Sequence, residues 1–311
     1  MLEPSASGDW EKDVMQKMLF ASLTEQRRQR RWGIFFKVLI FAYIILMTVM
    51  FWPKSTKPFP ATHTALVDLS GMINEDEASL VLSGLRDAFE APQAKGIIIR
   101  INCPGGSSVH SGYLYDEIVR LRKIHQDKLV YAVVTDLAAS GGYYVASAAD
   151  YIYAYPTSLV GNIGALMPLF GFVGTMEHLG IEQRSITSGE NKLFLDPFAP
   201  ENTKQREFAQ KMLDDVHNTF IQAVKEGRGD RLKASPDVFS GLIWTGQQAL
   251  ELGLVDGLGS PGFVARELIG AEDVVNYTPS PSLLDRFANR AGASVSNQLM
   301  THLSLRPTGV Q

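Results

Sequence analysis

The feature that most constrains the fold is an alternation of short apolar, β-rich runs with helical patterns between residues 64 and 154. Hydrophobic periodicity predicts strands at 64–69, 96–102, 129–135 and 151–154. Helical patterns lie between them, at 77–90, 112–122 and 142–149. Strands that alternate with helices predict a mainly parallel sheet covered by helices, which is an α/β fold.

The same pattern continues less regularly toward the C-terminus. We expect one more strand at 182–187, a long amphipathic helix at 203–226 and a short helix at 246–252. No linker-like composition interrupts 64–270, so the chain is expected to form one domain there rather than two. After about residue 280, serines, prolines and a weak apolar pattern predict a flexible tail.

An apolar run at 32–52 precedes this domain, interrupted only by Lys37 and closed by Pro53. Its 21 residues are enough to cross a bilayer as a helix. A cleaved signal peptide and a buried core helix are the alternatives, but a helix that is apolar all round and follows four arginines at 27–31 is more typical of a membrane span. The basic residues also predict a cytoplasmic N-terminus and a periplasmic or extracytoplasmic domain.

The predicted organisation therefore has five parts. They are a cytoplasmic arm at 1–31, a transmembrane helix at 32–53, a linker at 54–63, the α/β domain at 64–279 and the tail at 280–311.

Composition excludes several classes of partner. The formal net charge of −4 shows no basic surplus for nucleic acid, and no cluster of Cys and His has the spacing of a zinc site. We expect no metal and no nucleic-acid partner. The single cysteine, Cys103, cannot form an internal disulfide.

Ser140 is the first candidate for catalysis. It follows a predicted strand in a turn of small residues, Ala138-Ala139-Ser140-Gly141-Gly142, and precedes a helix. A serine at such a turn exposes its hydroxyl beside backbone N–H groups that can stabilise an oxyanion. The alternative is a serine that simply caps the helix.

A second glycine turn, Pro104-Gly105-Gly106, follows the strand at 96–102. Carboxyl ends of parallel strands share one edge of the sheet, so the N–H groups of Gly106 and Gly141 could together form an oxyanion hole. A plain tight turn is the alternative. Cys103 is expected to be a small buried residue rather than a nucleophile.

A serine nucleophile needs a base. None of the six histidines lies in a turn with catalytic character, and only His110, which opens a helix close to the glycine turn, is kept as a secondary candidate for the base. Lys192 is the better candidate, because three apolar residues follow it in its loop. Desolvation by such neighbours would have to lower the lysine pKa from about 10.4 to about 7. The alternative is an ordinary solvated lysine.

Together these segments resemble the bacterial signal peptide peptidase A family, over about 66–259. The motifs that carry the resemblance are Asn102-Cys103-Pro104-Gly105-Gly106, the intact Ala138–Tyr144 run, Ser188-Gly189 with Lys192, and Trp244-Thr245-Gly246 through Asp256. The family comprises membrane-bound serine peptidases with a Ser/Lys dyad and a ClpP/crotonase-like fold. The resemblance implies that Ser140 is the nucleophile, Lys192 the general base, and Gly106 and Gly141 the oxyanion donors.

The resemblance also implies a homo-oligomer whose protomers share active sites, hydrophobic peptide substrates such as signal-peptide remnants, and no cofactor. Two positions depart from the family pattern. Asn162 stands where a serine usually supports the lysine, and its side-chain oxygen can still accept a bond from an amine. Cys103 replaces another serine and is expected to be silent.

Three alternatives remain open. A ClpP-type Ser/His/Asp peptidase is weakened because no histidine follows Ser140 before His178. A crotonase-like acyl-CoA enzyme would not need both Ser140 and Lys192. A scaffold that binds peptides without cleaving them is favoured only by Asn162.

Overall fold

The computed structural model describes residues 7–50, 61–233 and 235–279. Most of the predicted linker and the whole predicted tail at 280–311 therefore lie outside the described residues. The chain divides into two compact units, Met1–Pro58 and Phe59–Gln311, and each is considered by itself.

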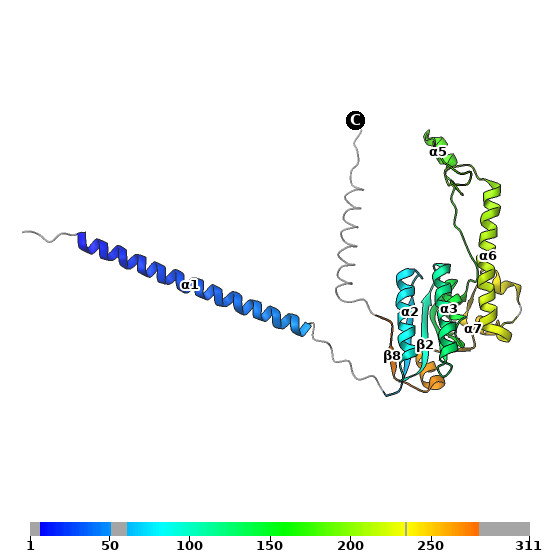
Figure 1. Ribbon diagram of the computed structural model, residues 1–311, viewed down its shortest axis with the longest axis horizontal. Helices are drawn as coiled ribbons and strands as arrows, with labels where there is room; N and C mark the ends of the chain where they lie inside the picture. The colour runs from blue at the N-terminus through cyan, green and yellow to red at the C-terminus, as the bar shows by residue number, and fades with distance from the viewer. Residues whose placement is uncertain (1–6, 51–60, 234, 280–311) are drawn as a thin grey trace, which may run out of the picture. The chain divides into compact units, whose positions relative to one another are not determined.

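The first unit contains one long helix, α1 (Ser7–Met50), which Figure 1 shows as a single unbroken element. Within it, Arg27–Thr48 is long and apolar enough to cross a membrane, with a mean hydropathy of 1.7 and no part buried inside the protein. The boundary predicted between residues 31 and 32 does not interrupt the helix. The polar arm and the apolar run thus share one helical axis.

The second unit is built on an eight-stranded sheet in which all pairings are parallel except that of β5 with β6. The strands are β1 (His63–Ser70), β2 (Ala94–Cys103), β3 (Val130–Ala139), β4 (Tyr151–Ala154), β5 (Leu159–Gly161), β6 (Ile243–Thr245), β7 (Gly257–Leu258) and β8 (Val274–Asn276). Their main order is β6-β5-β3-β2-β1-β8, with β4 paired to β3 and β7. The predicted parallel α/β sheet is confirmed.

Helices connect and cover these strands. They are α2 (Glu75–Glu90), α3 (Ser108–Ile124), α4 (Gly141–Ala146), α5 (Val173–Leu179), α6 (Thr203–Arg228), α7 (Gly246–Glu251) and α8 (Pro261–Phe263). Three further turns of helix are η1 (Gly229–Arg231), η2 (Pro236–Phe239) and the π-helical η3 (Val264–Ile269).

The alternation of side chains along the strands sends apolar residues to both faces of the sheet. Val67 and Ile99 belong to the larger buried cluster, which also contains apolar side chains of α2, α3, α4 and the C-terminal half of α6. Leu66 and Ile98 belong to a smaller cluster that η3 completes on the other face. This burial on both faces fixes the strands and hence the loops at their carboxyl ends.

Strand β3 is long enough to pair with two strands in succession on the same side. Its first half pairs with β4 and its last residues, from Leu137 to Ala139, pair with β5. On the other side β2 runs beside it, with Cys103 opposite Ala138. The carboxyl ends of β2, β3 and β5 therefore meet at one place.

The predicted strand at 182–187 is wrong. These residues are extended but form no strand within the described chain, and all of them are exposed. A β-rich sequence becomes a strand only where a neighbouring edge can accept its hydrogen bonds, and this segment lies away from the sheet. The three-residue strands β5, β6 and β8 were not predicted, because they are too short to show a period.

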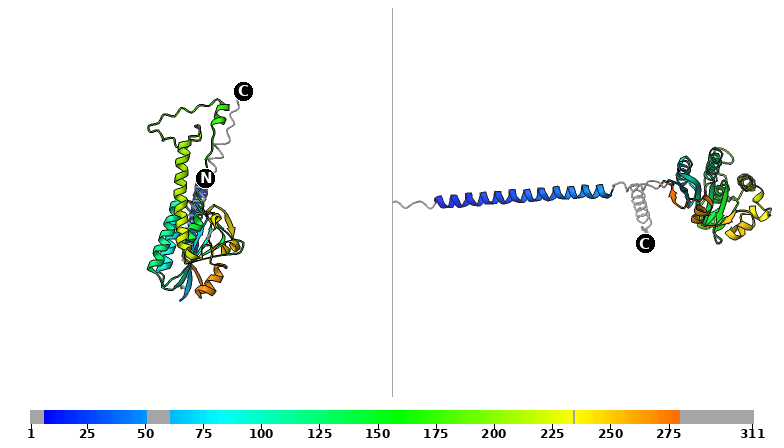
Figure 2. Two further views of the ribbon diagram at one scale, coloured as in Figure 1. Left: turned by 90° about the vertical axis from the view of Figure 1, so that its right-hand side faces the viewer. Right: turned by 90° about the horizontal axis from the view of Figure 1, so that it is seen from below.

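Residues 165–202 form a projecting arm that includes α5. Figures 1 and 2 show this arm beyond the sheet, at the N-terminal end of α6. Its side chains are unusually apolar for an exposed segment. The large exposed hydrophobic residues of the arm are Leu166, Met167, Leu169, Phe170, Phe172, Leu179, Ile181, Ile186, Leu193 and Phe198.

Candidate active site

Ser140 lies at the sharp turn between β3 and α4, with φ of 50° and ψ of −124°. A positive φ is uncommon for a residue with a side chain and is typical of strained functional turns. The Ser140 N–H donates to the Gly161 carbonyl over 2.9 Å, and its carbonyl accepts from Tyr143 and Tyr144. Both backbone groups are thus fixed on opposite sides of the residue.

The side chain of Ser140 makes no capping hydrogen bond to α4, so the helix-cap alternative is wrong. The residue is half-buried. Its hydroxyl is therefore not used by the helix, which is the arrangement of a nucleophile elbow.

The two glycine turns lie side by side, as predicted. A Cβ placed on Gly105 would come within 2.8 Å of Ser140 Cβ and 3.0 Å of Gly141 N. A Cβ on Gly106 would come within 2.3 Å of the Ile73 carbonyl oxygen. Both glycines have positive φ, 108° and 150°. Only glycine allows this close approach of the backbone.

The backbone bonds around Gly106 and Gly141 fix the directions of their N–H groups. Ile73 N donates to Gly105 O, and Ser107 N donates to Ile73 O. Since successive N–H groups of extended backbone point to opposite sides, the Gly106 N–H points away from Ile73. Gly141 is the first residue of α4, so its N–H has no acceptor within the helix.

Two buried residues, Ser111 and Cys103, pack against these turns. Ser111 on α3 lies so close to Gly141 that a Cβ there would come within 2.3 Å of Ser111 Oγ. Cys103 packs against Gly142 and accepts a hydrogen bond from Gly105 N over 3.3 Å. Burial raises the pKa of the Cys103 thiol, which disfavours the nucleophilic thiolate. Cys103 is a packing residue, as expected.

Asn162 directly follows the Gly161 carbonyl that binds Ser140. Its own φ is 52°, and its N–H donates to Leu242 O over 2.7 Å. Asparagine tolerates this left-handed conformation better than most residues, which gives a backbone reason for its presence. The next residue is held by α6, because Ile163 O lies 3.1 Å from His217 Nε2.

Lys192 is not brought to Ser140 within one chain. It is exposed, in a turn of the arm that is tied to α6 because Gln205 Nε2 donates to Asn191 Oδ1 over 3.1 Å. Ser140 lies near the other half of α6, where the Tyr144 ring stacks on Phe220 at 4.9 Å. Fifteen residues of helix separate the two anchoring points, which is about 22 Å at 1.5 Å per residue.

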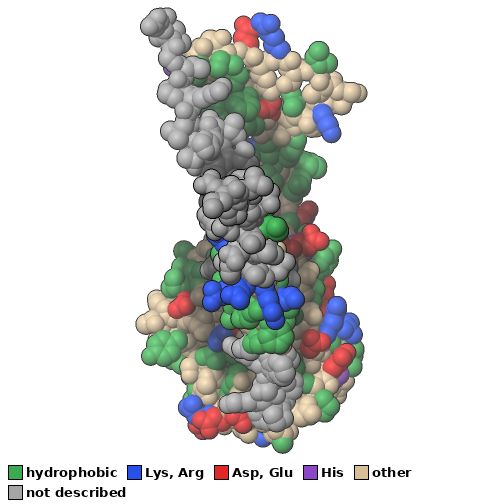
Figure 3. Space-filling view, turned by 90° about the vertical axis from the view of Figure 1, so that its left-hand side faces the viewer, with side chains coloured by type: hydrophobic (Ala, Val, Ile, Leu, Met, Phe, Trp, Pro, Cys, Tyr) green, Lys and Arg blue, Asp and Glu red, His purple; other side chains and the backbone are tan. Residues whose placement is uncertain are grey.

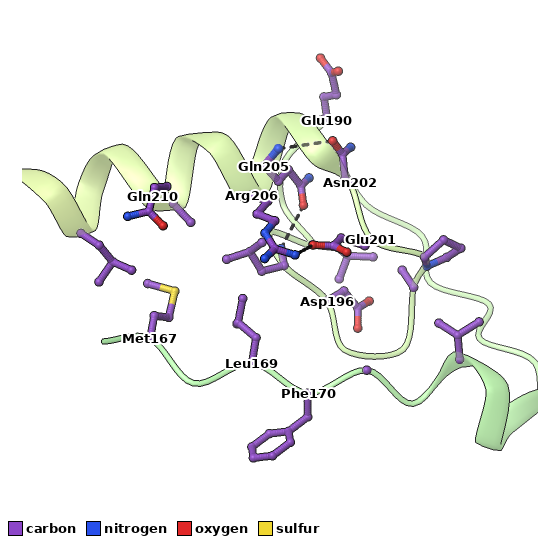
Figure 4. Close-up of a pocket in the computed structure, with 18 of the residues that line it drawn as sticks. Met167, Leu169, Phe170, Glu190, Asp196, Glu201, Asn202, Gln205, Arg206 and Gln210 are labelled. Carbon is purple, nitrogen blue, oxygen red and sulfur yellow. Dashed lines mark hydrogen bonds and ion pairs between the residues drawn. The ribbon is translucent and has the colours of Figure 1, made fainter. Parts of the chain in front are cut away.

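A cavity of about 810 Å³ lies beside the Lys192 turn, between the arm and α6 (Figure 4). In Figure 4, Met167 and Leu169 point from the extended segment toward the helix. Polar residues close the other side, including an Arg206–Glu201 ion pair of 2.5 Å. This cavity adjoins the candidate base rather than the candidate nucleophile.

His110 lies in the first turn of α3, half-buried, with its ring edge-on to Tyr113 at 5.9 Å. Its ring makes no hydrogen bond to any residue that the structure describes, and thus none to Ser140. Within the same part of the chain, no three His, Cys, Asp or Glu side chains are grouped to hold a metal ion.

Sequence reasoning missed Ser111, Gly161 and His217. They act on the site only through contacts between distant segments, and no local pattern marks them. In the structure Ser107 caps the start of α3, and Ser111 Oγ, one turn later on the same helix, donates to the Ser107 carbonyl.

Comparison with known proteins finds relatives of this chain among peptidases. The sequence profile of Peptidase family S49 matches residues 122–272. A putative protease of Synechocystis sp. is 30% identical over 211 residues, covering 68% of this chain and 74% of that protein. A putative signal peptide peptidase SppA of Enterococcus faecium is 29% identical over 178 residues, covering 57% of this chain and 51% of the relative.

A protein of Brucella abortus named Na(+)/H(+) antiporter NhaA is 45% identical over 186 residues, which is 60% of this chain but 25% of the relative. The chain therefore spans from a quarter to three-quarters of the length of these curated relatives.

Proposed function

Because the chain belongs to peptidase family S49, with its ClpP-like fold, we propose that it is a serine endopeptidase whose nucleophile is Ser140. The observation that carries this proposal is the strained turn at Ser140. Its hydroxyl is not used by α4, and Gly105 and Gly141 pack directly against it.

In the proposed mechanism, the Ser140 hydroxyl attacks the carbonyl carbon of the scissile peptide bond. Neutral Lys192 Nζ takes the hydroxyl proton. The Gly106 and Gly141 N–H groups donate to the resulting oxyanion. The C–N bond then breaks, Lys192 returns the proton to the leaving amine, and water hydrolyses the acyl ester by the same steps.

We further propose that Lys192 serves the Ser140 of a neighbouring copy in a homo-oligomer. The separation of about 22 Å along α6 between the anchoring points of the two residues supports this assignment. The exposed apolar surface of the arm supports it as well, because a large unpaired apolar surface is typical of an interface. Docking there would also remove water from around Lys192, and a desolvated amine favours the neutral form that a general base requires.

The proposed substrates are hydrophobic, unfolded segments such as signal-peptide remnants. The extended segment that leaves β5 supports this, since residues 162–172 include exposed apolar side chains and form no strand with the described residues. An extended peptide could add to this backbone as a further strand. Asn162 would support the lysine amine at the same place.

The proposed location is the bacterial inner membrane. The apolar stretch of α1 would cross it once, with the N-terminal arm in the cytoplasm and the domain from residue 64 onward on the other side. Added protease should leave the domain intact in whole cells, whose outer membrane excludes it, and should digest the domain in spheroplasts whose inner membrane is still sealed; a domain that stays intact in such spheroplasts would refute this orientation.

The main test is cleavage of an unfolded hydrophobic protein by the detergent-solubilised full chain. Ser140→Ala and Lys192→Ala should each abolish cleavage while the chains stay folded. If Lys192→Ala keeps most of the activity, the base is another group and the dyad is refuted. If the unsubstituted chain binds such peptides but never cleaves them, the scaffold alternative replaces the peptidase.

Mixing the two inactive variants tests the shared site. Co-assembly of equal amounts should restore about a quarter of full activity, since only sites with an intact Ser140 from one copy and an intact Lys192 from its neighbour can work. If mixing restores nothing although mixed oligomers form, both residues must come from the same copy.

A further inference from the structure

The N-terminal part of the apolar stretch in α1 carries a dense basic cluster. Arg27, Arg28, Arg30 and Arg31 are all exposed. Residues 25–37 hold five basic side chains and one acidic one, a net charge of +4. No described carboxylate forms an ion pair with any of these arginines. The cluster therefore has positive charge without a partner in the part of the chain that the structure describes.

An aromatic group lies directly after these arginines on the same helix. The rings of Trp32, Phe35 and Phe36 contact one another, with centroids 5.7–5.8 Å apart. Figure 3 looks along α1 from its N-terminal side and shows basic side chains gathered beside hydrophobic ones. Tryptophan at the end of an apolar run is typical of the membrane–water interface. The aromatic group thus sets the depth at which the basic cluster would lie.

Helix geometry brings two arginines onto the aromatic face. Arg28 precedes Trp32 by four residues and Arg31 precedes Phe35 by four, so each pair shares a face one turn apart. Side chains on a helix lean toward its N-terminus, which carries both guanidinium groups away from the apolar run. They would reach the level of lipid phosphates while the rings stay at the edge of the acyl chains.

We propose that Arg28 and Arg31, above this aromatic group, form a binding site for the headgroup of an anionic glycerophospholipid. Guanidinium groups match phosphate geometry through paired hydrogen bonds, and unpaired basic clusters beside a span attract anionic lipid. Nucleic acid or a soluble phosphate would use the charge but not the adjoining aromatic group. The proposal rests on the membrane span proposed above.

The experiment reconstitutes the full chain into vesicles and compares a spin-labelled phosphatidylglycerol with a spin-labelled phosphatidylcholine by electron spin resonance. The unsubstituted chain should select the anionic lipid. Each arginine near the surface is worth about fivefold in binding, so Arg28→Gln with Arg31→Gln should remove most of the preference. The control is Arg184→Gln with Arg206→Gln, which removes the same charge from the arm and the first turn of α6 and should leave the preference unchanged.

The proposal is overturned if the unsubstituted chain shows no preference for the anionic lipid, or if both double variants lose it equally. Extraction with alkaline carbonate separates this failure from failure of the span, because a spanning chain stays with the membrane whatever lipid it selects. Peptidase activity in a detergent without anionic lipid is measured in parallel. It should be equal in the unsubstituted chain and the Arg28/Arg31 variant, so it tests the proposed function independently.

Discussion

Replacing Ser140 by glycine should stabilise the protein while abolishing catalysis. Ser140 holds φ at 50° and ψ at −124°, a conformation that glycine adopts freely and a residue with a Cβ does not. Ser140→Ala removes the hydroxyl but keeps the Cβ and the strain. The two variants are equally unable to attack a substrate, so a difference between their stabilities reports the strain alone.

The size of the effect follows from two opposing terms. A residue in a sparsely populated region of φ and ψ costs about 1–3 kcal/mol. Glycine raises the entropy of the unfolded chain, which offsets about 0.5–1 kcal/mol of that gain. The net expectation is that the free energy of unfolding of Ser140→Gly is higher than that of Ser140→Ala by about 0.5–2 kcal/mol, or about 1–8 °C in Tm for a domain of this size.

Thermal unfolding of the solubilised full chain, followed by near-ultraviolet circular dichroism, measures this difference. Asn162→Gly is the matched control, because Asn162 also has a positive φ of 52° but asparagine adopts this conformation at lower cost than most residues. The Tm change caused by Asn162→Gly should be smaller than the Tm difference between Ser140→Gly and Ser140→Ala. If Ser140→Gly melts at or below Ser140→Ala, the turn is not strained and the reasoning fails.

Three further predictions concern the frame of the site. Asp256 forms two bonds, of 2.7 and 2.8 Å, with the fully buried Arg228, so Asp256→Asn should cost about 3–5 kcal/mol in chemical unfolding. Burial raises the pKa of Asp256, but the bonds and charge of Arg228 outweigh it and leave the pKa lowered. Ionised Asp256 therefore contributes to the free energy of unfolding above the ordinary carboxyl pKa of about 3.9, and this contribution is lost as the pH falls below that value. The Tm of the unsubstituted chain should fall over this pH range by more than the Tm of Asp256→Asn. His217→Ala should lower kcat with little change in stability because it releases the Ile163 carbonyl, and His217→Gln should restore kcat; equal kcat in all three would contradict this role. Gly106→Ala should lower kcat by about 10²–10³-fold, because its Cβ meets the backbone of the neighbouring segment and turns an oxyanion donor; retention of full activity would exclude that donor.

The sequence by itself determined the fold class, the three central strands and the adjacency of the two glycine turns. Strand runs at 64–69, 96–102 and 129–135 have a clear composition, and β1, β2 and β3 confirm them within a few residues. The two glycine turns were predicted side by side, because parallel strands necessarily end at one edge. These predictions depended only on local residue types, because glycine and other small residues are required wherever two backbone segments approach closely.

Only the tertiary structure decided how Lys192 relates to Ser140. Both residues follow predicted strands, but the strand at 182–187 does not exist and Lys192 lies at the far end of α6. An apolar sequence pattern does not distinguish residues that the sheet buries from residues that are exposed in the folded chain, such as Leu166 and Phe170 of the arm. The strained conformation of Ser140 could not be predicted from the sequence either. Its φ is imposed by backbone hydrogen bonds of Ser140 with Gly161, Tyr143 and Tyr144, which form only in the folded chain.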